Sequence, residues 1–237
     1  MKNKATEPTK DTFKHFFNGA FSVDIVLIAY LDGSLKFLLQ KKQDYPVVNE
    51  WGLPGELILP EQDTDKAIDE LLIKNIGHSD VFKSNLRAFS ELNRHPLGRI
   101  ITIAFYGLIS FDKVPNKLPE NLKWANLEAN YELTLDHNHI LEEAKKKFKE
   151  NLIQKPVVFN LLPEKFIISD LIKIYELAFD KKVDVANFRK RIVSSKMIRA
   201  TGEFKQRYKS HGRPAEYYTY EGQIKKKSEK ESILFNF

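Results

Sequence analysis

The chain has 237 residues, of which 42% are hydrophobic and 30% are charged, and it contains no cysteine. This length suits one large domain or two small ones, and the hydrophobic content suffices for packed cores. The lack of cysteine excludes disulfides, thiolate metal sites and cysteine nucleophiles. No apolar run approaches the roughly 20 residues of a membrane span, and the polar start MKNKATEPTK lacks the apolar segment of a secretory signal. We therefore expect a soluble, cytoplasmic protein with no membrane partner.

The net charge of +6 is unevenly distributed. Residues 154–237 contain 18 Lys and Arg against 10 Asp and Glu, whereas the first 153 residues contain 20 against 22. A basic back half behind a near-neutral front half suggests that the back half meets a polyanion. A solvated, lysine-rich surface would give the same counts, so charge alone does not decide between the two.

The front half begins with a predicted β-hairpin. Residues 1–12 are polar and are expected to form a loose terminus. Phe21 to Tyr30, FSVDIVLIAY, is rich in apolar and β-branched residues and predicts a buried strand. Asp32-Gly33 is a turn signal, and Leu35 to Gln40 is the returning strand.

The stretch that follows, WGLPGELILPEQDTDKAIDELLIKNIG from Trp51 to Gly77, predicts a Pro-Gly turn, a short strand, an acidic loop and a helix. This layout resembles a Nudix box, the phosphate-and-metal motif of the Nudix hydrolases. If Gly77 is the closing glycine of that motif, its helical glutamates are replaced by Leu71, Lys74 and Asn75. A second register, anchored on Gly55, also loses the paired glutamates.

Magnesium prefers oxygen ligands, and neither leucine nor lysine supplies one. The resemblance therefore implies a Nudix fold without pyrophosphatase chemistry, with no metal, no cofactor and no catalytic residues. Asp65 and Asp69, four residues apart, leave a displaced metal site open. The alternative is that these carboxylates only favour the positive N-terminal end of the helix dipole.

The rest of the front half predicts more strands and a final helix. Val81 to Leu92 holds one or two short strands, Ile100 to Ile109 is the strongest strand signal, and Trp124 to Leu127 is a short segment. LDHNH, from Leu135, opens a helix that runs to about Glu150. This order fits a mixed α+β sandwich. HPLGRIITIAFY and LDHNHILEEA resemble the second half of Nudix domains of the ADP-ribose pyrophosphatase type.

The back half predicts two helices and a hairpin. Pro156 marks a change of domain, and FNLLPEKF is a short connector. Ser169 is expected to cap a first helix that ends at Lys181-Lys182, and Asp184 to cap a second helix from Val185 to about Lys196. Two short strands between Ile198 and Tyr220 then enclose a basic loop. Helix, turn, helix and hairpin is the order of a winged helix-turn-helix.

The second helix of the back half has an apolar side, Phe188, Ile192 and Val193, that leaves its basic residues outward or along the flank. A helix that enters the major groove needs this arrangement, and cations in a wing would contact phosphates. The alternative is that both segments are solvated faces of a small interaction domain. The predicted DNA-binding residues are Asn187, Arg189, Lys190, Arg191, Lys205, Arg207, Lys209, His211 and Arg213.

Three stretches of the back half, FNLLP, NFRKR and GRPAEYY, are distinctive. Together with the Nudix-like front half they resemble the Nudix-related transcriptional regulators, most closely the sugar-responsive branch typified by the arabinose regulators of Bacteroidetes. Another branch of that family senses ADP-ribose. The resemblance implies a homodimer that binds a palindromic operator in double-stranded DNA and responds to a small molecule in the Nudix-like cleft.

The resemblance and the chain order together predict an α+β architecture in four parts. These are a flexible N-terminus (1–12), a Nudix-like effector-binding domain (13–153), a winged helix-turn-helix domain (154–224) and a basic tail (225–237).

Effector-site candidates lie in or beside the loops of the expected cleft, because a sugar site needs several hydrogen-bonding groups over an aromatic floor. They are Lys41, Trp51, Arg94, Arg99, Tyr106, Asp136 and His137.

Two other functions remain open on the sequence. One is a Nudix pyrophosphohydrolase of a nucleoside diphosphate-linked substrate, with an accessory basic domain. The other is an RNA-binding adaptor, which is disfavoured because the basic module lacks the exposed aromatic pattern of single-strand binders.

Overall fold

The computed structural model describes residues 19–43, 47–205 and 214–222 of the chain. Its front half is built on a seven-stranded sheet whose main path runs β3-β2-β1-β6-β5. The strands of that path are β1 (Ala20–Leu31), β2 (Ser34–Lys41), β3 (Trp51–Gly52), β5 (Phe82–Phe89) and β6 (Ile100–Ile109). Two further strands pair off the path: β4 (Gly55–Leu57) with β1, and β7 (Leu122–Asn126) with β2.

The centre of this sheet is a parallel pair, β1 and β6, in register from Ala20 with Ile100 to Ala29 with Ile109. Both strands are apolar along most of their length because helices cover both faces of the sheet. The β1–β2 hairpin turns at Asp32 and Gly33, whose φ angles of 52° and 73° fit the expected turn. The sequence prediction of these three strands is confirmed.

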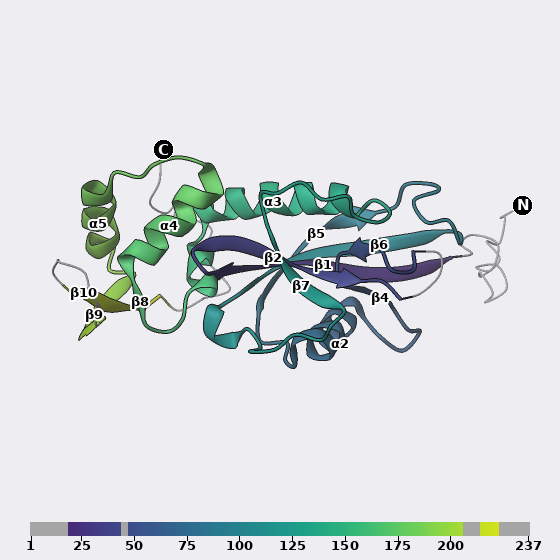
Figure 1. Ribbon diagram of the computed structural model, residues 1–237, viewed down its shortest axis with the longest axis horizontal. Helices are drawn as coiled ribbons and strands as arrows, with labels where there is room; N and C mark the ends of the chain where they lie inside the picture. Colours follow the sequence, from purple (N-terminus) through teal and green to yellow (C-terminus); the bar gives the residue numbers. More distant parts are fainter. Residues whose placement is uncertain (1–18, 44–46, 206–213, 223–237) are drawn as a thin grey trace, which may run out of the picture.

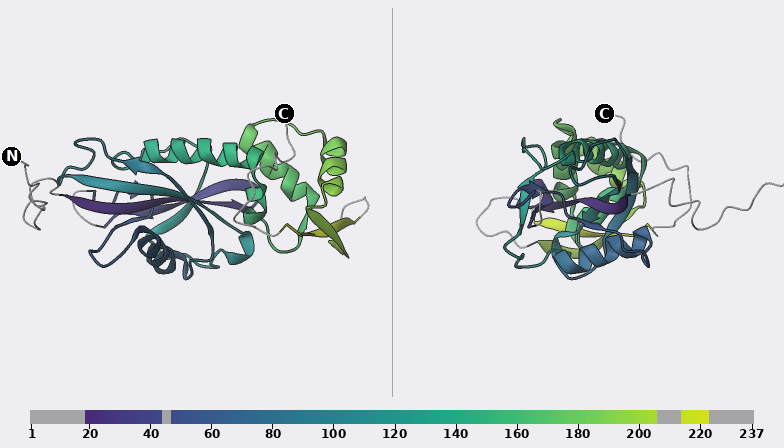
Figure 2. Two further views of the ribbon diagram at one scale, coloured as in Figure 1. Left: turned by 180° about the vertical axis from the view of Figure 1, so that it is seen from behind. Right: turned by 90° about the vertical axis from the view of Figure 1, so that its right-hand side faces the viewer.

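Two helices enclose the sheet (Figures 1 and 2). α2 (Thr64–Ile76) packs Ile68, Leu71 and Leu72 against one face, in a core that also includes Val23 and Ile25 of β1. α3 (His137–Gln154) covers the other face, where its apolar stripe meets the intervening residues of β1. Because side chains alternate along β1, every second residue faces α2 and the residues between them face α3.

The back half follows α3 without an extended linker. It comprises the 3-10 helix η2 (Pro156–Leu161), β8 (Phe166–Ile167), α4 (Ile168–Phe179), α5 (Val185–Ser194), β9 (Ile198–Lys205) and β10 (Ala215–Tyr220). A second 3-10 helix, η1 (Phe111–Lys113), lies in the front half. The strands β8, β10 and β9 form a small sheet in that order, and this end of the molecule is farthest from α2 (Figure 1).

Two details of the back half differ from the sequence prediction. Ser169 does not cap α4, because the helix already begins at Ile168 and its N-cap position is Ile167, without a side-chain cap. The short strand β8 was not expected, since two residues are too few to give a pattern. Asp184 caps α5 as predicted, accepting hydrogen bonds from the backbone N–H groups of Ala186 and Asn187 at 3.1 Å.

One apolar core continues from the front sheet into the back half. The cluster that includes Phe148 and Leu152 of α3 extends through Leu171 and Tyr175 of α4 to Phe188 of α5. The Tyr175 hydroxyl donates a hydrogen bond across the junction to the Leu152 carbonyl at 3.1 Å. The two halves are therefore packed as one body at α3 and α4. No helix of the described residues is long and apolar enough to cross a membrane.

Because the core is shared, the two halves should unfold together. Leu171 is fully buried, so Leu171→Ala should lower the free energy of unfolding by about 3 kcal/mol. Both tryptophans, Trp51 and Trp124, lie in the front half, so their fluorescence reports only on that half. The fluorescence midpoint should fall together with the far-UV circular dichroism midpoint, whereas the volume-conserving Leu171→Met should move neither by much. A fluorescence midpoint unchanged by Leu171→Ala would contradict the shared core.

Candidate functional site

The helix α2 occupies the place of the helix in the Nudix-box resemblance, and it ends where that pattern expects a glycine. Gly77 is its C-cap, with φ 85° and a hydrogen bond from its N–H to the Ile73 carbonyl. Leu71 is buried in the core, and Asn75 is 7% exposed with no partner for its Nδ2 among the described residues. Lys74 forms an ion pair with Glu56 at 2.6 Å.

These side chains do not fit a magnesium site. Leucine offers no ligand atom, and the Lys74 ammonium stands where a cation would have to bind. Of the two carboxylates that left a displaced site open, Asp69 forms an ion pair with Lys83, and Asp65 is exposed in the first turn of α2. Within the described residues, no group of three or more His, Asp or Glu side chains is placed to share a metal ion.

A polar cluster lies on the opposite face of the sheet, beneath the start of α3. Arg94 holds Asp136 with two hydrogen bonds, from Nε at 2.8 Å and from Nη2 at 2.6 Å. Its Nη1 donates to the Thr102 hydroxyl at 2.6 Å, and Thr102 in turn shares a 2.6 Å hydrogen bond with Ser22. The Arg94 side chain is only 4% exposed, so this fork is fixed in place.

Asp24 and His137 form the buried floor of the cluster. The His137 Nδ1 accepts a hydrogen bond from the Leu53 N–H at 2.8 Å, so its proton sits on Nε2, which faces Asp24 Oδ2 at 3.7 Å. Burial lowers the pKa of His137 to about 3, so the ring is neutral at pH 7. Burial also raises the pKa of Asp24 to about 6, with Lys42 and Arg94 acting against the rise.

The WGLPG segment approaches this floor so closely that two of its positions require glycine. A Cβ on Gly55 would lie 1.7 Å from Asp24 Oδ1, and a Cβ on Gly52 would lie 2.7 Å from His137 Nδ1. The Trp51 carbonyl also accepts a hydrogen bond from the Thr134 N–H at 2.9 Å. Close backbone approach of this kind is a use to which only glycine is suited.

Three of the predicted effector residues, Arg94, Asp136 and His137, come together at this cluster, and the Trp51 backbone is tied to its edge through Thr134. Lys41 pairs with Trp51 across β2 and β3. Lys42, which was not predicted, acts to lower the pKa of both Asp24 and His137 through its charge.

The other two candidates lie elsewhere. Arg99 donates to the carbonyls of Ser90 and Glu91 in the neighbouring loop. Tyr106 is 0% exposed in the core, with its hydroxyl bound to Asn151 near the C-terminal end of α3. We therefore leave Tyr106 out of the candidate site.

Sequence reasoning missed Ser22, Asp24 and Thr102. They occupy alternate positions of β1 and β6, on the strand face that α3 covers. A charge inside the apolar run FSVDIVLIAY was the available signal, since Asp is almost never fully buried without a partner.

The second candidate surface is α5. Phe188 and Ile192 face the core, while Arg189, Lys190 and Arg191 are exposed, as is Asn187 near the helix start. This matches the predicted division into an apolar back and a cationic front except at Val193, which was predicted on the apolar side but is 46% exposed. Arg189 is partly held by a hydrogen bond from its Nη2 to the Tyr218 hydroxyl at 3.3 Å.

The hairpin beside α5 is antiparallel, with Lys205 exposed at the end of β9. Lys196, exposed in the turn between α5 and β9 with φ 59°, is a further cation at this end that the sequence prediction did not include. Four predicted wing residues lie outside the described residues: Arg207, Lys209, His211 and Arg213.

Comparisons with known proteins agree with this architecture. Residues 158–220 match the NrtR DNA-binding winged helix domain. The back half of the chain is therefore similar to the winged helix domain of NrtR proteins. The chain is 25% identical over 205 residues to the ADPR responsive transcriptional repressor NtrR of Acinetobacter baylyi, covering 84% of this chain and 81% of that protein.

Solved structures extend the NrtR-like fold to the front half. The crystal structure of Shewanella oneidensis NrtR complexed with a 27mer DNA matches with a TM-score of 0.77 and 24% identity, over 84% of this chain and 93% of that one. A MutT/nudix family protein from Enterococcus faecalis matches with a TM-score of 0.67 and 18% identity, over 90% and 94% of the two chains. The predicted α+β class, a Nudix-like domain followed by a winged helix domain, is confirmed.

The buried Asp24 carboxyl gives a testable pH dependence. The folded state binds its proton more tightly than the unfolded state, so the charge opposes folding above pH 6. Asp24→Asn removes that charge. The free energy of unfolding of this variant, minus that of the wild type, should rise between about pH 4 and pH 6 and then level off. The full gain is up to about 3 kcal/mol. Urea unfolding at several pH values measures it, and a difference that does not change with pH would contradict the buried charge.

Proposed function

We propose that this protein is a ligand-responsive transcriptional regulator that binds operator DNA through α5 and the β9–β10 hairpin. The observation that carries the proposal is α5 itself, a capped helix with buried Phe188 and Ile192 and with exposed Arg189, Lys190 and Arg191. An apolar back and a cationic front suit entry into the major groove. The match of residues 158–220 to a DNA-binding domain supports the same reading.

Within this surface we assign base reading to the N-terminal and outward residues of α5. Arg side chains can bind guanine with two hydrogen bonds, and the Asn187 amide suits adenine. The remaining proposed contacts, which act on phosphates, are Lys205, Arg207, Lys209, His211 and Arg213. The wing contacts would supply affinity and salt dependence rather than sequence choice.

The effector is proposed to bind at the polar cluster of the front half. Asp136 and His137 lie at the start of α3, Arg94 is held between Asp136 and Thr102, and the backbone of Trp51 is hydrogen-bonded to Thr134 nearby. The Lys123 ammonium lies over the Trp51 ring, 3.8 Å from the ring centroid. Carboxylates and an arginine fork suit a hydroxyl-rich ligand that also carries an anion.

The proposed ligand is a pentose or a molecule that contains one. ADP-ribose is the first candidate, because the Acinetobacter relative is named as ADPR responsive. An arabinose-like sugar, suggested by the sequence resemblance, is the second. Both carry a pentose, but only ADP-ribose carries a pyrophosphate, so the two are separable by experiment.

We also propose that the protein acts as a homodimer on a palindromic operator, in the cytoplasm. Two half-sites about one helical turn apart need two winged domains at a fixed separation.

We further propose that the chain is not a hydrolase, because Leu71, Lys74 and Asn75 leave α2 without magnesium ligands. The competing function is a Nudix pyrophosphohydrolase. Magnesium-dependent cleavage of ADP-ribose by the wild-type chain, above the background rate, would favour that alternative.

The DNA proposal predicts the effect of Arg189→Ala combined with Lys190→Ala. Binding to a duplex selected by the wild type from a random pool should weaken by at least about tenfold, and the salt dependence should become less steep by roughly two units of log–log slope. Fluorescence anisotropy measures both. The control, Lys66→Ala with Lys74→Ala on α2, removes the same charge away from α5 and should bind normally. Wild-type affinity in the Arg189/Lys190 variant would contradict the assignment of α5.

The effector proposal predicts the effect of Arg94→Lys, which keeps the charge but removes the two-pronged contact with Asp136. ADP-ribose or arabinose should raise the melting temperature of the wild type, because a ligand that binds the native state stabilises it. The shift should be largely lost in Arg94→Lys, and Arg99→Lys in the neighbouring loop serves as the control. An equal shift in wild type and Arg94→Lys would place the effector elsewhere.

A further inference from the structure

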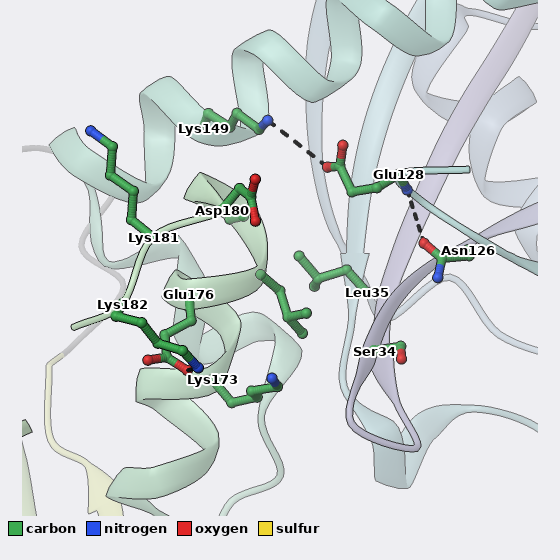
Figure 3. A pocket seen from close by; sticks show the side chains of 12 residues that line it. Ser34, Leu35, Asn126, Glu128, Lys149, Lys173, Glu176, Asp180, Lys181 and Lys182 are labelled. Carbon is green, nitrogen blue, oxygen red and sulfur yellow. Dashed lines mark hydrogen bonds and ion pairs between the residues drawn. The ribbon is translucent and has the colours of Figure 1, made fainter. Parts of the chain in front are cut away.

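A cavity lies at the junction of the two halves, away from the polar cluster. It is open, with a volume of about 530 Å³, within the usual range for small-molecule sites. One wall belongs to the front half and the other to α4 and the turn after it (Figure 3). The front wall consists of Ser34, Leu35, Asn126, Glu128 and Lys149.

The α4 end of this cavity carries a net positive charge of one, because Lys173, Lys181 and Lys182 outnumber Glu176 and Asp180. Lys173 and Lys182 both act electrostatically on Glu176, and their ammonium groups lie at the same end of the cavity (Figure 3). Glu176 is already engaged, because it accepts hydrogen bonds from the Val183 N–H at 3.3 Å and from Lys182 at 3.5 Å. Lys173 has no ion pair within 4.0 Å among the described residues, although it is half-buried.

The opposite end is suited to hydroxyl groups. Glu128 lies 3.9 Å from Lys149, a loose ion pair, and therefore keeps free acceptor capacity. The Asn126 Oδ1 accepts a hydrogen bond from the Glu128 N–H at 3.0 Å, so its Nδ2 is left as a donor. Leu35 lies between the two ends (Figure 3), and it supplies an apolar floor with Leu177 and Ala178.

We propose that this junction cavity is a second binding site, for a small sugar phosphate. The phosphate lies at the end formed by Lys173 and Lys182, where ammonium groups act as point charges on its oxygens. The sugar hydroxyls bind Glu128 and Asn126, and the carbon skeleton lies on Leu35. This division of donors and acceptors matches a ligand that is anionic at one end and hydroxylated at the other.

Occupancy of the cavity would link the two halves. The ligand touches β2 and β7 on one side and α4 on the other, and α4 leads directly into α5. A ligand that prefers one arrangement of α4 against the sheet must shift the population of that arrangement. The expected consequence is a change in DNA affinity. This consequence rests on the proposed DNA-binding function, whereas the binding of the ligand to the cavity is independent of that function.

Isothermal titration of the full chain at low ionic strength tests the site with three probes: ribose 5-phosphate, ribose and inorganic phosphate. Ribose 5-phosphate should bind, inorganic phosphate should bind more weakly, and ribose should not bind measurably. Lys173→Ala with Lys182→Ala should weaken ribose 5-phosphate at least about tenfold, because removing the charged partners of a bound anion is costly. Lys173→Arg should retain most of the affinity, and Lys66→Ala with Lys74→Ala is the charge-matched control.

Glu128→Gln separates the two ends of the cavity. It should weaken ribose 5-phosphate while leaving inorganic phosphate unchanged, since only the sugar reaches Glu128.

The proposal is overturned if ribose 5-phosphate does not bind at millimolar concentration, or if the Lys173/Lys182 variant binds it normally. It is also overturned if inorganic phosphate binds as tightly as ribose 5-phosphate. If ribose 5-phosphate binds as expected but the chain binds no DNA duplex, the junction site stands and the proposed DNA-binding function fails.

Discussion

The structure depends on the apolar contact between α3 and α4. Side chains of α3, among them Phe148 and Leu152, are fully buried between the front sheet and Leu171 and Tyr175 of α4. A flexible linker would let the two halves move independently, whereas a shared core transmits displacement, because close-packed interiors rearrange between discrete packings rather than deform continuously. The same helix α3 begins at the polar cluster and ends against the back half. Any rearrangement of Asp136 and His137 therefore acts on an element that is rigidly connected to α4.

Two charged side chains of the polar cluster, those of Asp24 and Arg94, are buried, which is unusual for charged residues. Its members are held by one another, with Arg94 bound to Asp136 and to Thr102, but Asp24 is buried at a cost that its raised pKa reflects. Native folds retain such groups chiefly where a site needs them, so perturbed pKa values mark functional candidates. On the opposite face of the sheet, the α2 positions that resemble metal ligands hold a buried leucine, a buried asparagine and a paired lysine. In this chain the polar chemistry of the front half lies under α3 rather than on α2.

The sequence was sufficient for the elements with long, clear periodicity. The β1–β2 hairpin, β6, α3 and α5 were all predicted close to their observed bounds, since hydrophobic alternation and capping residues such as Asp184 are local signals. The continuity of the core was not predictable, because Pro156 suggests a boundary whereas the contact of Tyr175 with Leu152 depends on tertiary packing. Ser22, Asp24 and Thr102 were missed because they meet only through strand pairing. Tyr106 was chosen for its chemistry, and its burial follows from the position of α3, which no local pattern reveals.

The proposed regulation links the polar cluster, at one end of α3, to the cationic helix α5 at the other end of the molecule. Its most direct test is the affinity of the full chain for a duplex selected from a random pool, measured by fluorescence anisotropy with and without saturating ADP-ribose or arabinose. The account predicts that one of these ligands changes the dissociation constant of the selected duplex by at least about fivefold, the lower end of usual allosteric coupling. An identical dissociation constant with either ligand bound at saturation would contradict it.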